Sequence, residues 1–228
     1  MDKKIIIGSL TAVIIVLAIF VAVERYGGDN GTEPAVAGDA EYEVTFESTW
    51  SAATHPYNFP SNPHFSGLIG ATHDSTVSFW AEGELAPVGI KNVAEKGSKN
   101  PFNNEIDAAL AAQTAFNKLS GGGIGTSPGS VSLTFQVSNE YPLVTLVSMI
   151  APSPDWFVGV SGLSLYENGE WVSEKVVELY LYDAGTDSGV NFTSRDVVTT
   201  PPVVIARIDE SVLPGSSVPY GTFTSTRQ

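Results

Sequence analysis

The sequence contains no cysteine, which excludes disulfide bridges, thiolate zinc sites, iron–sulfur clusters and cysteine nucleophiles. Basic residues are scarce: 11 lysines and arginines stand against 25 aspartates and glutamates, giving a formal net charge of −14. Nucleic-acid binding needs clusters of basic residues that displace counterions, so we expect no nucleic-acid partner. The chain has 228 residues, of which 43% are hydrophobic. That is enough for a packed core. Without cysteine, the domain is stabilised by this core or by a hard metal ion that oxygen atoms bind.

The usual catalytic and phosphate-binding motifs are also missing. No Gly-x-Ser-x-Gly elbow is present, and the glycines at 121–125 lack the Gly-Lys-Ser/Thr ending of a phosphate loop. His55, His64 and His73 stand nine residues apart, without a His-x-x-x-His pair, which favours scattered loop histidines over a zinc site. We therefore predict that the protein is not an enzyme.

The amino terminus contains one long hydrophobic run. Lys3 and Lys4 precede residues 5–23, which carry no charge and are long enough to cross a bilayer core of about 30 Å. The small-x-small cleavage pattern at residues 35–37 lies well beyond this run, so an uncleaved signal anchor is favoured over a cleaved signal peptide. We expect residues 1–4 to form a cytoplasmic tail and residues 24–40 a linker. This arrangement predicts a single-pass protein of the cell membrane, attached through its N-terminal helix, with the main domain, residues 41–228, extracytoplasmic.

The rest of the chain is dominated by short strand-like segments. Residues 42–47, 131–137 and 143–150 alternate between apolar and polar side chains, as half-buried strands do. Asn168-Gly169 predicts a hairpin turn. Further strands are predicted at residues 77–81, 157–165, 170–172, 176–182, 203–208 and 222–227.

Two segments have helical spacing instead. Residues 87–96 and 101–119 are predicted helices, and glycines 121–123 end the second one. Strand and helix do not alternate regularly, as a parallel sheet would require. We therefore predict a mainly β protein, an antiparallel β-sandwich with a helical insertion.

Three aspartates lie in two segments that can meet at one end of such a sandwich. Asp155 stands after two prolines where a strand begins, and Asp183 and Asp187 flank a glycine-containing loop. Three carboxylates a few Å apart repel one another, which raises their pKa values or requires a cation. Ca²⁺ suits carboxylates, carbonyls and hydroxyls such as those of Thr186 and Ser188, whereas Mg²⁺ prefers a stricter octahedron. An ordinary solvated turn is the alternative.

Aromatic residues offer a further candidate. Trp156, Trp171, Tyr166, Tyr180 and Tyr182 have the composition of a sugar-stacking platform. Their strand spacing favours packing within the core or on a sheet face.

These segments resemble the spondin amino-terminal domain family. The resemblance rests on Pro-Ser-Pro-Asp-Trp-Phe-Val-Gly-Val at residues 152–160 and Tyr-Asp-Ala-Gly-Thr-Asp-Ser-Gly at residues 182–189. Leu-Ile-Gly-Ala-Thr-His at residues 68–73, followed by Phe79-Trp80, is similar to an earlier motif of the family. The resemblance extends from about Glu41 to Gln228, and the motifs follow one another in the same order as in the family.

The resemblance implies a C2-like β-sandwich that binds Ca²⁺ through Asp155, Asp183 and Asp187. It also implies adhesion or binding to an extracellular matrix or cell envelope, with an unidentified surface glycan, polymer or protein as partner. The animal members contain cysteines and further domains, so their partners do not transfer to this chain, which looks like a prokaryotic, membrane-anchored version. A glycan-active hydrolase and a purely structural envelope component remain alternative functions.

Overall fold

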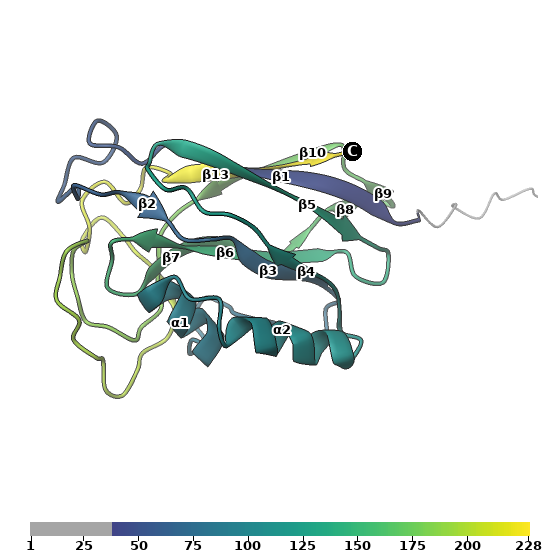
Figure 1. Ribbon diagram of the computed structural model, residues 1–228, viewed down its shortest axis with the longest axis horizontal. Coiled ribbons are helices and arrows are strands. Elements are labelled where there is room, and N and C mark those ends of the chain that lie inside the picture. Colours follow the sequence, from purple (N-terminus) through teal and green to yellow (C-terminus); the bar gives the residue numbers. More distant parts are fainter. Residues whose placement is uncertain (1–37) are drawn as a thin grey trace, which may run out of the picture. The chain divides into compact units, whose positions relative to one another are not determined.

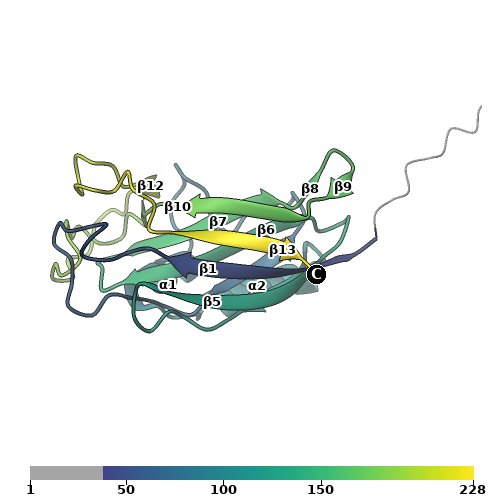
Figure 2. The same cartoon turned by 90° about the horizontal axis from the view of Figure 1, so that it is seen from above.

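The computed structural model describes residues 38–228, which form two antiparallel β-sheets packed face to face (Figure 1). The first sheet has four strands in the order β10-β13-β1-β5, which Figure 2 shows side by side. In β1, side chains alternate between buried and solvent-facing positions, because only one face of this sheet is covered. The strands are β1 (Ala40–Ser48), β5 (Gly129–Val137), β10 (Glu174–Leu179) and β13 (Gly221–Arg227).

The second sheet has seven strands and forms the middle layer. Its order is β12-β11-β7-β6-β3-β4, and β2 pairs with β6. Nearly all of β6 is buried, because this strand has protein on both faces. The predicted one-sided alternation of residues 143–150 is therefore wrong. The strands are β2 (His64–Phe65), β3 (Ile69–His73), β4 (Ala115–Ser120), β6 (Leu143–Ala151), β7 (Trp156–Ser164), β11 (Tyr182–Asp183) and β12 (Ala206–Arg207).

Two helices cover the outer face of the seven-stranded sheet (Figure 1). They are α1 (Val88–Lys96) and α2 (Phe102–Ala111). Gly97 ends α1 in the left-handed conformation, with φ at 61°, as helix-ending glycines commonly do. The Glu105 carboxylate of α2 accepts a hydrogen bond of 2.7 Å from the Gly89 N–H of α1, which joins the two helices.

Two hydrophobic cores follow from these three layers. One lies between the two sheets and includes Trp50, Trp156 and Phe223. The other lies between the seven-stranded sheet and the helices and includes Phe79 and Phe102. The predicted antiparallel sandwich with a helical insertion is confirmed for residues 38–228.

The hairpin prediction is also confirmed. β8 (Tyr166–Glu167) and β9 (Glu170–Trp171) pair across Asn168 and Gly169, whose φ angles are 54° and 87°. Positive φ at both central residues is the requirement of the tight turn that Asn-Gly favours.

Three further segments differ from the prediction. The helix predicted over residues 101–119 ends at Ala111, Gln113 turns the chain with φ at 59°, and residues 115–120 form β4 against β3. Residues 77–81 form no regular strand. They belong to a loop that is held to the core by the buried side chains of Phe79 and Trp80. The prediction missed β3, since Gly70 interrupts its pattern and all five of its residues are buried.

The predicted cytoplasmic tail, membrane-spanning segment and most of the linker fall within residues 1–37, outside the described residues. Within residues 38–228, the structure contains no helix with the length and hydrophobicity needed to cross a membrane.

Candidate metal centre

Strand pairing brings the two aspartate segments together at one end of the seven-stranded sheet. β11 pairs with β7 so that Asp183 lies opposite Trp156, the neighbour of Asp155. The Ala184 N–H donates to the Asp155 carbonyl at 3.1 Å, which continues the contact past the end of β11. The loop after β11 therefore begins directly beside Asp155, as the sequence predicts.

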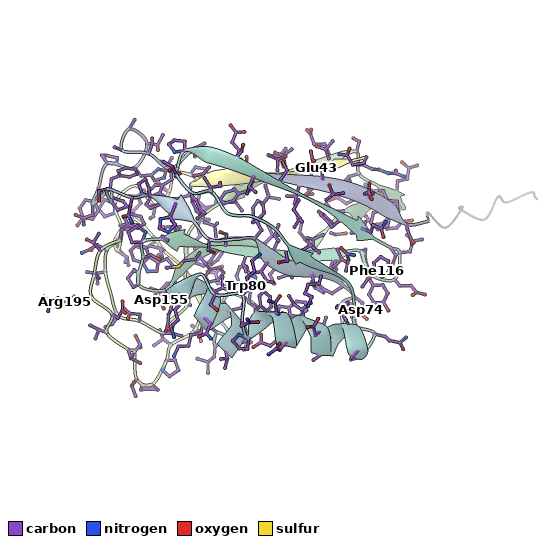
Figure 3. All side chains as sticks on the ribbon, viewed as in Figure 1. Glu43, Asp74, Trp80, Phe116, Asp155 and Arg195 are labelled. Atoms are coloured by element: carbon purple, nitrogen blue, oxygen red, sulfur yellow. The ribbon has the colours of Figure 1, made fainter. Side chains whose placement is uncertain are left out.

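Asp155, labelled in Figure 3, lies next to this loop, is fully buried, and organises the loop through one carboxylate oxygen. Its Oδ2 accepts hydrogen bonds from the Thr186 N–H at 2.7 Å, the Asp187 N–H at 2.9 Å and the Thr186 hydroxyl at 3.1 Å. Three donors on one oxygen fix the turn of the loop around the carboxylate. The Thr186 hydroxyl, a calcium ligand in the sequence-based prediction, thus donates its proton within the protein.

The second oxygen of Asp155 lacks such partners. No donor within residues 38–228 reaches Oδ1, although this atom is buried. A buried carboxylate oxygen without a partner costs free energy, and native proteins rarely leave one unsatisfied. Oδ1 is therefore a buried acceptor of this region that is open to a further ligand.

The electrostatics of the region point the same way. Burial, and then the charge of Asp183, raise the pKa of Asp155 to about 6. Burial also raises the pKa of Asp183, and the charge of Asp187 adds to that rise. Each carboxylate thus raises the pKa of the one before it, as expected for negative charges held together without a cation.

Asp183 and Asp187 each support a turn of the loop. Asp183 Oδ1 accepts a 2.6 Å hydrogen bond from the Gly185 N–H. Gly185 has a φ of 74°, and a Cβ there would lie 2.2 Å from the Val203 carbonyl oxygen, so only glycine fits. Asp187 accepts from the Gly189 N–H at 2.8 Å through Oδ1 and from the Val197 N–H at 2.6 Å through Oδ2.

The carboxylate oxygens of this region are the kind of ligand that a hard cation such as Ca²⁺ prefers. Asp155 supplies an unused oxygen, and the neighbouring Asp183 supplies a second negative charge. Both oxygens of Asp187 already accept hydrogen bonds, so this residue would ligate only by sharing an oxygen. Within residues 38–228, no three His, Cys, Asp or Glu side chains form a ready-made metal cluster. The three-aspartate Ca²⁺ site therefore stays a prediction.

A cavity of about 220 Å³ opens next to Asp187. Glu95 and Lys96 of α1 line it together with Pro154, Asp196 and Val198. Sequence reasoning missed Glu95 and Asp196, because helix and loop meet only in the tertiary structure. No spacing signal along the chain connects them to the aspartates.

The three histidines lie in separate surroundings. His55 is buried against the Tyr220 ring, with ring centroids 4.0 Å apart. His64 lies in β2 and His73 ends β3, so the expectation that all three are loop residues is wrong for these two.

The comparisons with known proteins identify the family. The Spondin_N family matches residues 40–222. The chain belongs to this family. It is 36% identical to spondin-2 of Rattus norvegicus over 176 residues, which are 75% of this chain and 53% of the relative. It is 35% identical to spondin-2 of Homo sapiens over the same length, with the same coverage.

Spondin-1 of Gallus gallus is also similar, with 36% identity over 170 residues, or 72% of this chain and 21% of the relative. The chain thus spans about half the length of the spondin-2 relatives and about a fifth of spondin-1. The resemblance read from the two aspartate motifs is confirmed at the level of the family.

Proposed function

We propose that this protein is a calcium-binding adhesion module on the outside of a cell. A Ca²⁺ ion binds at the end of the C2-like sandwich through Asp155 and Asp183, with Asp187 as the third ligand. The observation that carries the proposal is the buried Oδ1 of Asp155, which no donor within residues 38–228 satisfies.

A bound Ca²⁺ ion would remove two unfavourable features of the site, an unpartnered carboxylate oxygen and the repulsion between carboxylates. The ion would give Oδ1 of Asp155 a partner, and it would offset the repulsion that raises the pKa of Asp155 and Asp183. Ca²⁺ accepts six to eight oxygens in flexible geometry, so backbone carbonyls and water can complete the shell.

The loop after β11 is then the binding element. Asp155 holds its beginning through the Thr186 and Asp187 N–H groups, and Asp187 holds its far side through Val197. Loops fixed on a rigid scaffold commonly carry recognition. The partner is a surface glycan, polymer or protein of the matrix or envelope, and the segment at residues 5–23 anchors the chain in the membrane.

Retention of the purified full chain on cell envelopes tests this function. We expect binding in millimolar Ca²⁺ and release by a chelator, because the loop loses its anchor without the ion. Asp155→Asn should bind weakly under both conditions. The matched control is Asp107→Asn, which changes an exposed aspartate of α2 and should behave like the wild type.

Equal retention in calcium and chelator would contradict calcium-dependent adhesion and favour a purely structural envelope role. Turnover of a glycoside that Asp187→Asn abolishes would favour the hydrolase alternative instead.

A further inference from the structure

A second cavity, the edge pocket, lies between the edges of the two sheets, where β10 faces β7. Its volume is about 400 Å³, within the range of about 300–1,000 Å³ typical of ligand pockets. Its lining contains three aromatic rings, two carboxylates and a hydroxyl: Trp80, Tyr180, Tyr182, Glu82, Glu178 and Ser161. Figure 3 labels Trp80 of this pocket and Asp155 of the candidate metal centre.

The aromatic part of the pocket is rigid. Trp80 is 5% exposed and packs edge-to-face against Tyr182, with ring centroids 5.0 Å apart and an interplanar angle of 65°. Trp80 also packs edge-to-face against Phe157 at 5.0 Å. Tyr180 and Tyr182 are only partly buried. The Tyr182 ring is therefore already ordered by packing, which lowers the entropic cost of stacking a ligand on its accessible surface.

Hydrogen-bonding groups surround these rings. The Tyr180 hydroxyl donates to Glu178 Oε2 at 2.7 Å, which orients the carboxylate. The Arg207 guanidinium lies over one face of the Tyr180 ring, 3.6 Å from its centroid, and the backbone N–H of Arg207 donates to Glu82 Oε1 at 3.4 Å. Glu82 and Glu178 thus supply two hydrogen-bond acceptors to the pocket, and the Arg207 guanidinium lies beside it on the Tyr180 ring.

We propose that the edge pocket binds one ring of a neutral glycan. Pyranose rings have an apolar face that stacks on tyrosine and a rim of hydroxyl groups that both donate and accept hydrogen bonds. Glu82 and Glu178 accept from such hydroxyls, and the Arg207 guanidinium donates to them. The two carboxylates repel anionic sugars, and Arg207 repels a cationic ligand that approaches Tyr180.

None of the three aspartates lines this pocket, so a ligand can bind there without contacting the calcium ion. The inference thereby differs from the proposed function, which makes adhesion depend on the ion. Two of the aromatic residues that the sequence suggests as a sugar-stacking platform, Tyr180 and Tyr182, line this pocket. Trp156 and Trp171 are buried in the core between the sheets.

Titration of the full chain with a panel of neutral sugars tests the inference. The probes are glucose, galactose, mannose, N-acetylglucosamine and their β- and α-linked disaccharides, in buffer free of sugar-based detergent. Binding is followed by calorimetry and by NMR shifts of backbone amides. At least one probe should bind with shifts at residues 159–163 and 177–182, equally in calcium and in chelator.

Matched variants locate the binding. Tyr180→Ala should weaken it at least about tenfold, and Glu178→Gln severalfold, because stacking and a hydrogen bond are lost. Tyr57→Ala and Glu43→Gln change an exposed tyrosine and glutamate elsewhere and should leave the affinity unchanged. Failure of every sugar to bind at 20 mM would overturn the inference. Shifts confined to other residues, or tighter binding of arginine methyl ester than of any sugar, would overturn it too.

Discussion

His73, which ends strand β3 of the seven-stranded sheet, and Asp155, which directly precedes strand β7 of that sheet, are both buried, but of the two only His73 has all its polar atoms satisfied. His73 ends β3 and is 2% exposed. Its Nδ1–H donates to the Asp74 carbonyl at 2.7 Å, and its Nε2 accepts from the Thr145 hydroxyl at 2.8 Å. Asp155 has three donors on Oδ2 and, within residues 38–228, none on Oδ1.

The difference distinguishes a buried polar group whose hydrogen bonds are all made, His73, from one that still lacks a partner, Asp155. Burial lowers the pKa of His73, so its neutral ring fits a closed network that needs nothing more. Burial and a neighbouring charge raise the pKa of Asp155, which is the sign of a carboxylate lacking a counter-charge. We therefore expect His73 to matter for stability under all conditions and Asp155 to matter through calcium.

The largest expected effect is that of His73→Ala. The change removes a side chain that packs on Phe79 and leaves the Thr145 hydroxyl and the Asp74 carbonyl without their partner. The free energy of unfolding should fall by about 3 to 4 kcal/mol, equally in calcium and chelator, in urea titrations. His64→Ala, at a more accessible histidine, is the control and should cost less than about 1 kcal/mol. A loss that calcium restores would contradict the comparison.

The next effect is a pH dependence of Asp155 in chelator. Its folded pKa, about 6, lies above the ordinary value of 3.8, so the folded state binds this proton more tightly than the unfolded state. Wild-type stability relative to Asp155→Asn should therefore rise by about 2 to 3 kcal/mol as the pH falls from 7 to 4. Urea titrations of both proteins measure this difference, and the lowered pKa of His73 affects both alike. A constant difference would show that Asp155 is not strained in the absence of calcium.

A smaller effect is expected for Asp183→Asn. Calcium at 100 times its Kd should stabilise the wild type by about 2.7 kcal/mol, because it binds only the folded state. The variant loses one ligand charge, so calcium at that same concentration should add less than about 1 kcal/mol. Thermal unfolding with and without a chelator measures both increments. A full increment in the variant would remove Asp183 from the site.

The smallest effect is expected at the β8–β9 hairpin, which belongs to neither region. Gly169 has a φ of 87° and open space where a Cβ would lie. Gly169→Ala should therefore cost about 1 kcal/mol, from the strained φ alone, and leave calcium binding unchanged. Chemical unfolding together with calcium titration checks both parts. A change in calcium affinity would mean that general destabilisation, not the aspartates, controls the site.

The sequence predicted the strands whose two faces differ and failed where context decides. β1 and β5 alternate because solvent covers one face of their sheet. The pattern does not predict β3, because this strand is buried on both faces, and it predicts helix for β4, because Phe116 and Leu119 continue the helical spacing. Residues 115–120 form a strand because they pair with β3, and the spacing of residues along the sequence does not reveal this pairing.

For the candidate site, the sequence predicted that the segments of Asp155 and Asp187 converge if strand pairing joins them, and the Asp187 N–H does donate to Asp155. How the oxygens are used was not predictable. The hydrogen bonds of Asp155 Oδ2 depend on the turn that Gly185 makes possible, and the contact of Glu95 with this region depends on helix packing.

Isothermal titration of the metal-free full chain with CaCl₂ tests the central claim most directly. We predict one Ca²⁺ per chain for the wild type and for Asp107→Asn, and no measurable binding for Asp155→Asn. The Asn variant should remain folded in chelator, because its amide oxygen can still accept hydrogen bonds from Thr186 and Asp187. Absence of binding to the wild type at millimolar calcium, or unchanged binding to Asp155→Asn, would contradict the account.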